Sequence, residues 1–428
     1  MIDKDEKPHI TIDLYIFLGG LLFCNPAKGI NPDGLQSRGG LPAFFAKIRE
    51  KQEVTVVFLG GSITNHRGYR VQITEWMERN YPEIKIHAVN AGIGGTGSDL
   101  GVFRTDEDVL LHDPDLVFVE FAVNDSKTDS LLICNSMEGI VRKIKQQDPA
   151  TDICFLYTLN IGMLDDLKAG KTYRSVRFME NVAGHYGIPS VNFAYDVMDL
   201  LNKDQLVFKG EKDKSYPGKV VFTNDGTHPT FDGGHVIYTR TLAAALTELG
   251  KQQAGSAAFR MPAPLYPTHY EQAKMYSVDE FVRTGGWQPV TKDDKVYQYF
   301  QGDSGKLPVL LSSADPEDSI VVRFKGIRAG LFDVIGPSSG GISVQTDGEG
   351  SQYIRRFDVY CGNTNRTSYH LFDTLDNGMH TVIIKPDSRW FDKKEIYSSR
   401  PSSVKELSYF DEFNTYIGKI LVVGEVVR

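Results

Sequence analysis

The chain has 428 residues, which is more than a single hydrophobic core usually supports, so two domains are expected. Hydrophobic residues make up 41% and charged residues 24%, values typical of globular proteins and not of disordered or fibrous ones. The net charge of -8 and the lack of a long basic run exclude a nucleic-acid partner, because phosphate backbones are bound by clustered Lys and Arg.

An apolar run near the start of the chain, Ile10 to Cys24, allows two interpretations. It follows a Lys-containing start, as the apolar part of an export signal does, which would favour a periplasmic or secreted location. Asp13 interrupts it, however, and apolar and polar residues alternate as in a strand before the turn at Gly19-Gly20, so a β-hairpin is the alternative. The run is too short and interrupted to span a bilayer, and we expect no integral membrane association.

Residues 51–250 alternate short apolar runs with amphipathic ones, the pattern of an α/β domain with a parallel sheet. The expected strands are Val54 to Leu59, Lys85 to Val89, Asp115 to Phe121, Asp152 to Tyr157 and Pro189 to Phe193. The expected helices are Tyr69 to Tyr81, Ser98 to His112, Ser130 to Gln147, Tyr173 to Tyr186 and Phe231 to Leu249.

The character of the sequence changes after this region. Residues 251–284 have little periodicity and are expected to connect two domains. Residues 285–428 contain short alternating or β-rich segments separated by turn residues, which predict a β-sandwich. The four cysteines form no CxxC pair, and no His, Asp or Glu cluster has the spacing of metal ligands, so no metal or cofactor is expected.

The first candidate for chemistry is Ser62, which follows the strand Val54 to Leu59 directly after Gly60-Gly61. Ligands bind at the carboxyl ends of parallel strands, so a serine there among small neighbours is placed to act as a nucleophile. The alternative is a tight glycine turn in which Ser62 caps a helix.

The second candidate is the glycine-rich segment Asn90 to Ser98, which follows the next strand. Glycines allow close approach of the backbone, so an N-H group such as that of Gly95 can point at a developing oxyanion. A nucleotide-binding loop is the rival, but the segment lacks both the P-loop ending and the spacing of the dinucleotide fingerprint.

The third candidate is Asn124, which with Asp125 follows the third strand. Its side-chain amide stays neutral and donates a hydrogen bond at any working pH, as an oxyanion requires. A structural turn made by the Asn-Asp pair is the alternative.

The fourth candidate is the pair Asp225 and His228 in Asp-Gly-Thr-His-Pro, ahead of the last predicted helix. This separation brings a carboxylate to one imidazole nitrogen and leaves the other free to deprotonate a serine. A structural histidine beside a helix cap is the alternative. His235 has no carboxylate at that spacing and is expected to be packed or solvated.

All four segments lie at the carboxyl ends of predicted strands or in the loop beside them, so one pocket can contain them. Their order resembles the four blocks of the SGNH hydrolases, the GDSL esterase and lipase family, over residues 54–250. The first block departs from the family's Gly-Asp-Ser-Leu because Gly61 replaces the acidic residue. The third has Ala122 and Val123 where a glycine often precedes the Asn-Asp pair by one residue. The Gly-Gly-Ser-Ile-Thr version looks closer to the family's bacterial carbohydrate esterases.

The resemblance implies a flavodoxin-like α/β/α sandwich and a serine esterase mechanism. Ser62 would be the nucleophile, His228 the general base and Asp225 its orienting partner, while Ser62, Gly95 and Asn124 would form the oxyanion hole. The polar segment Asn65 to Arg70 suits a sugar better than an acyl tail, with a solvated helix start as the alternative. No long apolar lid-like insertion is visible in the sequence, so the predicted substrate is a short, preferably acetyl, ester on carbohydrate.

Other functions remain open from the sequence: a lipase or thioesterase of the same family, or a glycan-binding protein on a hydrolase scaffold. With features such as Phe324 to Gly326, Gly336-Pro337 and Asp376 to His380, the C-terminal segment resembles the jelly-roll modules attached to carbohydrate esterases. Either it binds glycan or it packs against the catalytic domain and walls its cleft. The aromatic residues Trp287, Trp390 and Tyr360 are candidates for stacking on sugar rings, with a place in the core as the alternative. The oligomeric state is not predicted.

Overall fold

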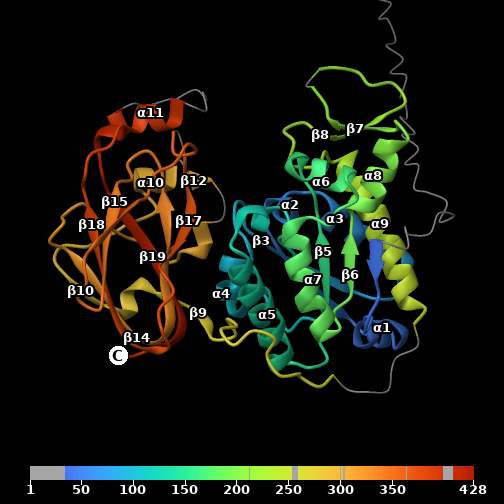
Figure 1. The fold of residues 1–428 in the computed structure, drawn as a ribbon, viewed down its shortest axis with the longest axis horizontal. Helices are drawn as coiled ribbons and strands as arrows, with labels where there is room; N and C mark the ends of the chain where they lie inside the picture. Colours follow the sequence, from blue (N-terminus) through green and yellow to red (C-terminus); the bar gives the residue numbers. More distant parts are fainter. Residues whose placement is uncertain are drawn as a thin grey trace, which may run out of the picture.

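The structure, a computed structural model, describes residues 34–211, 213–252, 259–298, 300–301, 304–362, 364–398 and 408–428. Two units lie side by side in it, a layered α/β domain and a β-rich domain that ends at the C-terminus (Figure 1). The apolar run Ile10 to Cys24, for which a signal or a hairpin was expected, lies outside the described residues.

The first domain is built on a six-stranded sheet with the order β1-β6-β5-β4-β2-β3. Its strands are β1 (Leu35–Gln36), β2 (Val54–Gly60), β3 (Ile86–Gly92), β4 (Leu116–Glu120), β5 (Asp152–Tyr157) and β6 (Ser190–Asn192). All neighbours pair in parallel except β1, which is antiparallel to β6. β4 and β5 are buried along their whole length, as their apolar sequences predict for strands covered on both faces. The predicted α/β fold is confirmed.

Helices cover both faces of this sheet. They are α1 (Pro42–Arg49), α2 (Ser62–Asn65), α3 (Tyr69–Asn80), α4 (Ser98–Asp108), α5 (Ser130–Gln147), α6 (Leu164–Lys168), α7 (Arg174–Tyr186), α8 (Ala194–Asn202) and α9 (Gly234–Gly250). Alternate residues of each strand point to opposite faces, so Val57 packs towards α4, α5 and α7 while Val56 packs towards α1, α3, α8 and α9. The five predicted helices are present, although α9 begins at Gly234 instead of Phe231.

The second domain contains an eleven-stranded sheet organised around two long neighbours, β14 (Ser319–Ile335) and β19 (Thr415–Val426). The other strands are β9 (Ala273–Ser277), β10 (Val282–Thr284), β11 (Gln288–Pro289), β12 (Phe300–Gln301), β13 (Leu311–Ser313), β15 (Gly341–Thr346), β16 (Gln352–Arg355), β17 (Asn365–Leu371) and β18 (Gly378–Asp387). Pairing is antiparallel except between β12 and β17. A β-rich C-terminal domain is therefore present, as predicted.

Two of these strands lie within residues 251–284, which the sequence predicts to be a connection. β9 pairs with β19 and β10 pairs with β14, so residues 273–284 are part of the second sheet. The strands are short and their partners are distant in the chain, which explains why no local alternation marked them.

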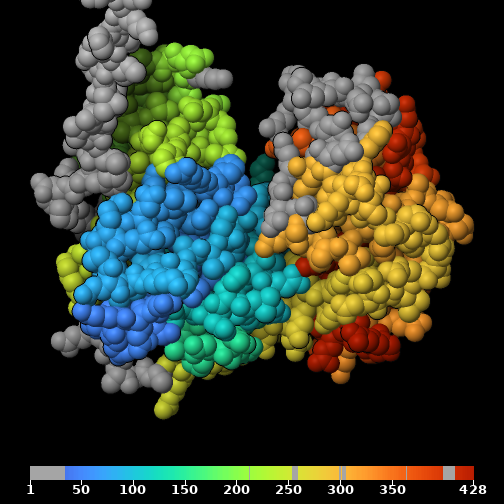
Figure 2. All heavy atoms as spheres, turned by 180° about the vertical axis from the view of Figure 1, so that it is seen from behind, coloured from blue at the N-terminus to red at the C-terminus, as the bar shows by residue number. Residues whose placement is uncertain are grey.

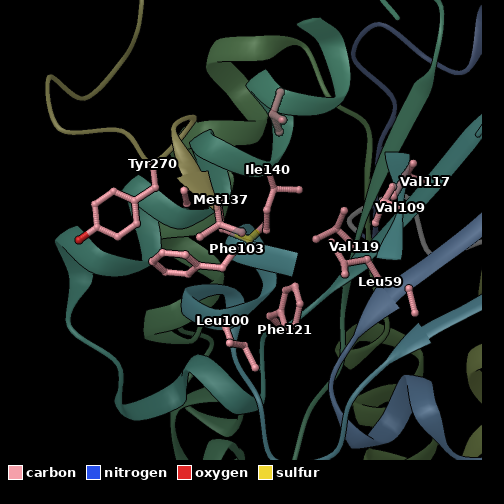
Figure 3. Packing of buried hydrophobic residues seen from close by; sticks show 14 of the residues in the cluster. Leu59, Leu100, Phe103, Val109, Val117, Val119, Phe121, Met137, Ile140 and Tyr270 are labelled. Carbon is pink, nitrogen blue, oxygen red and sulfur yellow. The ribbon is translucent and has the colours of Figure 1, made fainter. Parts of the chain in front are cut away.

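The two domains share an apolar contact. Phe103 of α4 and Met137 of α5 lie close to Tyr270, which precedes β9 (Figure 3). The same buried cluster continues into the second sheet through Phe332 and Leu421. Lys306 adds an ion pair to Asp108 at 2.5 Å, and Lys419 pairs with Glu107. Helix α4 is thus held by the second domain along its length.

From behind, the surface is hollowed between the domains, above the residues of α4 that join them (Figure 2). Among the described helices, none is both long and apolar enough to cross a membrane.

Candidate active site

The candidate residues gather at the carboxyl end of the sheet. β2 has β3 on one side and β4 on the other, so the direction of chain progression reverses at β2. Such a switch point separates the loops after neighbouring strands and leaves room for a ligand. Ser62 follows β2, Gly95 follows β3 and Asn124 follows β4.

Ser62 starts the one-turn helix α2 directly after Gly60 and Gly61. Both glycines are required by space. A Cβ on Gly60 would lie 2.3 Å from the Thr64 hydroxyl, and one on Gly61 would lie 2.1 Å from Asn124 Oδ1. This backbone fits only because neither residue has a side chain.

His228 and Asp225 reach Ser62 from a different part of the chain. The small sheet of β7 (Leu206–Lys209) and β8 (Val220–Thr223) leads into the turn that carries them. Ser62 Oγ lies 2.8 Å from His228 Nε2, and His228 Nδ1 lies 2.7 Å from Asp225 Oδ2. The three side chains therefore form one continuous line of hydrogen bonds. Gly226, at φ +91°, makes the turn between them.

Asp225 is the most strongly hydrogen-bonded member of this line. Its Oδ1 accepts the backbone N-H groups of Thr227 and His228, both at 2.8 Å, and the hydroxyl of Thr223 at 3.0 Å. Partial burial alone would raise the pKa of Asp225, but the hydrogen bond from the His228 ring and those from the backbone hold that pKa well below its usual range. Asp225 is consequently a fixed anion facing the histidine.

The segments around Gly95 and Asn124 border the same serine. A Cβ on Gly94 would lie 3.8 Å from Ser62 Cβ, so the glycine-rich loop passes directly beside it. Gly95 has φ +74°, and a Cβ added there would meet nothing within 4 Å. Asn124 starts a single 3-10 turn, and its side chain lies over Gly61. The structure thus brings all the predicted site residues to one end of the sheet.

His235 is packed in the core, one of the two states expected for it. The residue is 2% exposed, and its ring accepts the Tyr69 N-H at Nδ1 at 3.0 Å. Burial, with the neighbouring His66 and His228, lowers its pKa to about 4, so it is a neutral structural group. His66 is exposed, and its ring centroid lies 4.9 Å from that of His228.

Glu120 is a buried acid that the sequence did not single out. It ends β4 beneath α2, with 0% exposure, and accepts the Thr64 hydroxyl at 2.9 Å and the Thr158 hydroxyl at 2.6 Å. Burial raises its pKa to about 7, although hydrogen bonds from Thr158, Thr64 and the Gly61 backbone oppose that rise. Its position in an otherwise apolar strand was the only signal that could have drawn attention to it.

The three aromatic residues proposed for sugar stacking differ in exposure. Trp287 packs against the core of the second sheet, whereas Trp390 is 74% and Tyr360 54% exposed. In the described part of the chain, no group of three or more His, Cys, Asp or Glu side chains is arranged to hold a metal ion.

Comparison with known proteins identifies the family of the first domain. Residues 58–236 match the GDSL-like Lipase/Acylhydrolase family. No curated protein matches the chain. A solved two-domain esterase (CEX) active on acetylated mannans is similar over 92% of this chain and 98% of its own, with 18% identity and a TM-score of 0.70. The same esterase co-crystallised with mannopentaose gives 19% identity, the same coverage and a TM-score of 0.67.

The fold and the family match define a carboxylic ester hydrolase. The α/β domain belongs to the GDSL-like lipase/acylhydrolase family, so the family that the four sequence blocks resemble is confirmed. The likeness to the two-domain esterase extends over both domains and shows a shared fold.

Proposed function

We propose that the chain is a serine esterase in which Ser62, His228 and Asp225 form the catalytic triad. The observation that carries the proposal is the line of hydrogen bonds from Ser62 Oγ to His228 Nε2 at 2.8 Å and from His228 Nδ1 to Asp225 at 2.7 Å. His228 takes the proton of Ser62 as the hydroxyl attacks the ester carbonyl, then returns it to the leaving alcohol. Asp225 stabilises the imidazolium that forms in between.

The oxyanion of the tetrahedral intermediate would lie among the N-H groups of Ser62 and Gly95 and the amide of Asn124. Support comes from the packing of the glycine-rich loop beside Ser62 and of Asn124 over Gly61. Donors that are fixed before the reaction stabilise the developing charge without reorganising, and loss of one costs about 100- to 1000-fold in rate.

The substrate we propose is an acetyl ester on a carbohydrate. The residues that follow Ser62 are polar: His66 borders the His228 ring, Arg67 lies over the exposed ring of Phe231 at 5.4 Å, and Arg70 donates to the Thr64 carbonyl. Such groups suit sugar hydroxyls better than an acyl tail. The two-domain esterase with the same fold is described as active on acetylated mannans, which supports this substrate class.

The proposal is tested with 4-nitrophenyl acetate and the full chain. Ser62→Ala and His228→Ala should abolish turnover, while Asn124→Ala should leave a trace of it. A fluorophosphonate probe should label the wild type at Ser62 and leave Ser62→Ala unlabelled. Unchanged turnover in Ser62→Ala contradicts the triad, and an unlabelled wild type would favour a glycan-binding protein on a hydrolase scaffold.

The substrate class requires a second experiment. Release of acetate is measured from a panel of acetylated plant and bacterial polysaccharides, alongside 4-nitrophenyl esters of increasing chain length. We expect acetate release from at least one polysaccharide and a preference for acetyl over longer chains. A preference for long acyl chains would favour a lipase or thioesterase instead.

A further inference from the structure

Two carboxyl groups and one phenol meet behind the glycine-rich loop. Asp99 lies in the first turn of α4, Asp125 follows Asn124, and Tyr369 comes from β17 of the second domain. The Tyr369 hydroxyl donates to Asp99 Oδ1 at 2.7 Å, and the Ser98 N-H donates to Asp125 Oδ1 at 3.0 Å. In this Asp99-Asp125-Tyr369 cluster, a direct hydrogen bond joins the second domain to the first turn of α4, immediately after the glycine-rich loop.

Gly97 shows how closely the two carboxyl groups approach one backbone position. A Cβ on Gly97 would lie 2.2 Å from Asp125 Oδ1 and 2.8 Å from Asp99 Oδ1. Both acids are therefore seated against the loop that carries Gly95. Since Asp125 is also the neighbour of Asn124 in the chain, the cluster is connected to two of the three proposed oxyanion donors.

The cluster is buried. Asp125 is 0% and Asp99 9% exposed, and Asp125 Oδ2 has no hydrogen-bond partner among the described residues. Buried carboxyl groups so close together cannot both ionise without a large penalty. The position of each carboxyl group therefore depends on the hydrogen bonds that it makes. Asp99 accepts one hydrogen bond from the Leu100 N-H of its own helix and one from the Tyr369 hydroxyl of the second domain.

We propose that Tyr369 is a positioning residue for ester hydrolysis. By holding Asp99 it fixes residues 97–98, and the Ser98 N-H in turn fixes Asp125. The Gly95 N-H and the Asn124 amide therefore stay aligned with the oxyanion. The second domain then contributes to catalysis by ordering the oxyanion hole, independently of any sugar it contacts. This inference rests on the proposed function.

The alternative is that Tyr369 only stabilises the contact between the two domains. Helix α4 supplies a matched control, because Glu107 near its other end pairs with Lys419 of the second domain. Tyr369→Phe removes only a hydroxyl at the cluster, whereas Lys419→Gln removes an interdomain ion pair on the same helix.

The experiment measures kcat and KM for 4-nitrophenyl acetate, and Tm, in wild type and both variants. We expect Tyr369→Phe to lower kcat by about tenfold with KM within twofold, less than the loss of a whole oxyanion donor. Lys419→Gln should leave kcat unchanged. An unchanged kcat in Tyr369→Phe, or an equal fall in kcat in both variants, overturns the proposal.

A second set of variants tests the link through Asp99. Asp99→Asn keeps an oxygen that can accept from Tyr369 and should retain more activity than Asp99→Ala. Combining Asp99→Ala with Tyr369→Phe should cost no more than the larger single loss, because both act through one contact. Fully multiplicative losses overturn the inference. A wild type without esterase activity means instead that the proposed function fails, whereas an active wild type with an inactive Ser62→Ala and a fully active Tyr369→Phe contradicts only the inference.

Discussion

Asn124 lies against the backbone of Gly61, at the place where any side chain on residue 61 would begin. A Cβ there would stand 2.1 Å from Asn124 Oδ1 and 2.8 Å from its Cγ. The family pattern Gly-Asp-Ser-Leu has a side chain at this position, and this chain has Gly61 instead. The absence of a side chain at residue 61 therefore makes room for Asn124 in this orientation.

Gly61→Ala should displace the Asn124 amide and lower kcat. We expect a fall of about 100-fold, similar to that of Asn124→Ala, because misplacing an oxyanion donor resembles losing it. The measurement is kcat on 4-nitrophenyl acetate. Gly184→Ala is the control, since Gly184 lies in α7 with nothing within 4 Å of a Cβ, and it should keep full activity. Full activity in Gly61→Ala would show that Asn124 does not act from its present position.

Thr223→Val tests the support of Asp225. The Thr223 hydroxyl donates to Asp225 Oδ1 at 3.0 Å and accepts the buried Gly226 N-H at 3.1 Å. Removing it leaves that N-H unsatisfied, which costs about 1 to 3 kcal/mol of stability, and loosens the carboxylate. We expect kcat to fall by about tenfold and Tm to fall. Thr247→Val, in which an exposed hydroxyl in α9 bonded to Ala243 is lost, should change neither; equal effects in both variants would contradict a role for Thr223.

Asp125→Asn should change the pH profile on its alkaline side. Burial first, and then the nearby Asp99, raise the pKa of Asp125 to about 8, so this carboxyl is neutral below that pH and becomes an anion above it. The other titratable groups that act on the Asp99 and Asp125 carboxyls are Glu120, Tyr369 and Arg328.

A new negative charge behind the oxyanion hole opposes the negative transition state, so wild-type kcat should fall as the pH rises through about 8. Asn cannot ionise and keeps an oxygen for the Ser98 N-H, so Asp125→Asn should lack this fall. The measurement is kcat from pH 6 to 10 in both proteins, a range chosen to bracket the raised pKa. The same alkaline fall in Asp125→Asn would assign it to another group.

Much of the arrangement around Ser62 could be predicted from the sequence because its signals are local. Apolar runs gave the parallel strands, and the carboxyl ends of parallel strands meet at one edge, so Ser62, Gly95 and Asn124 had to be neighbours. The Asp225 and His228 pair was visible from its spacing alone. Their proximity follows from the topology, while their roles in catalysis stay predictions.

The remaining parts depend on contacts between distant residues. Tyr369 and Asp99 are separated by 270 positions, so no local pattern joins them. β9 and β10 are short edge segments whose partners come much later in the chain. Glu120 ends a buried strand, where its burial depends on the helices that cover it and on the Thr64 and Thr158 hydroxyls.

Glu120 should make stability depend on pH. Its pKa is near 4.3 in the unfolded chain and is raised to about 7 in the fold, chiefly by burial. Between these values the native state binds more protons than the unfolded state, so the free energy of unfolding falls as the pH rises from about 4 to 7 and then levels off. Glu120→Gln lacks this titration and can still accept one threonine hydroxyl. Denaturant unfolding of both proteins from pH 5 to 8 should show the wild type losing on the order of 3 kcal/mol relative to Glu120→Gln. All other titrating groups are common to both proteins, so a difference that stays constant with pH would mean that Glu120 is already ionised in the fold throughout this range.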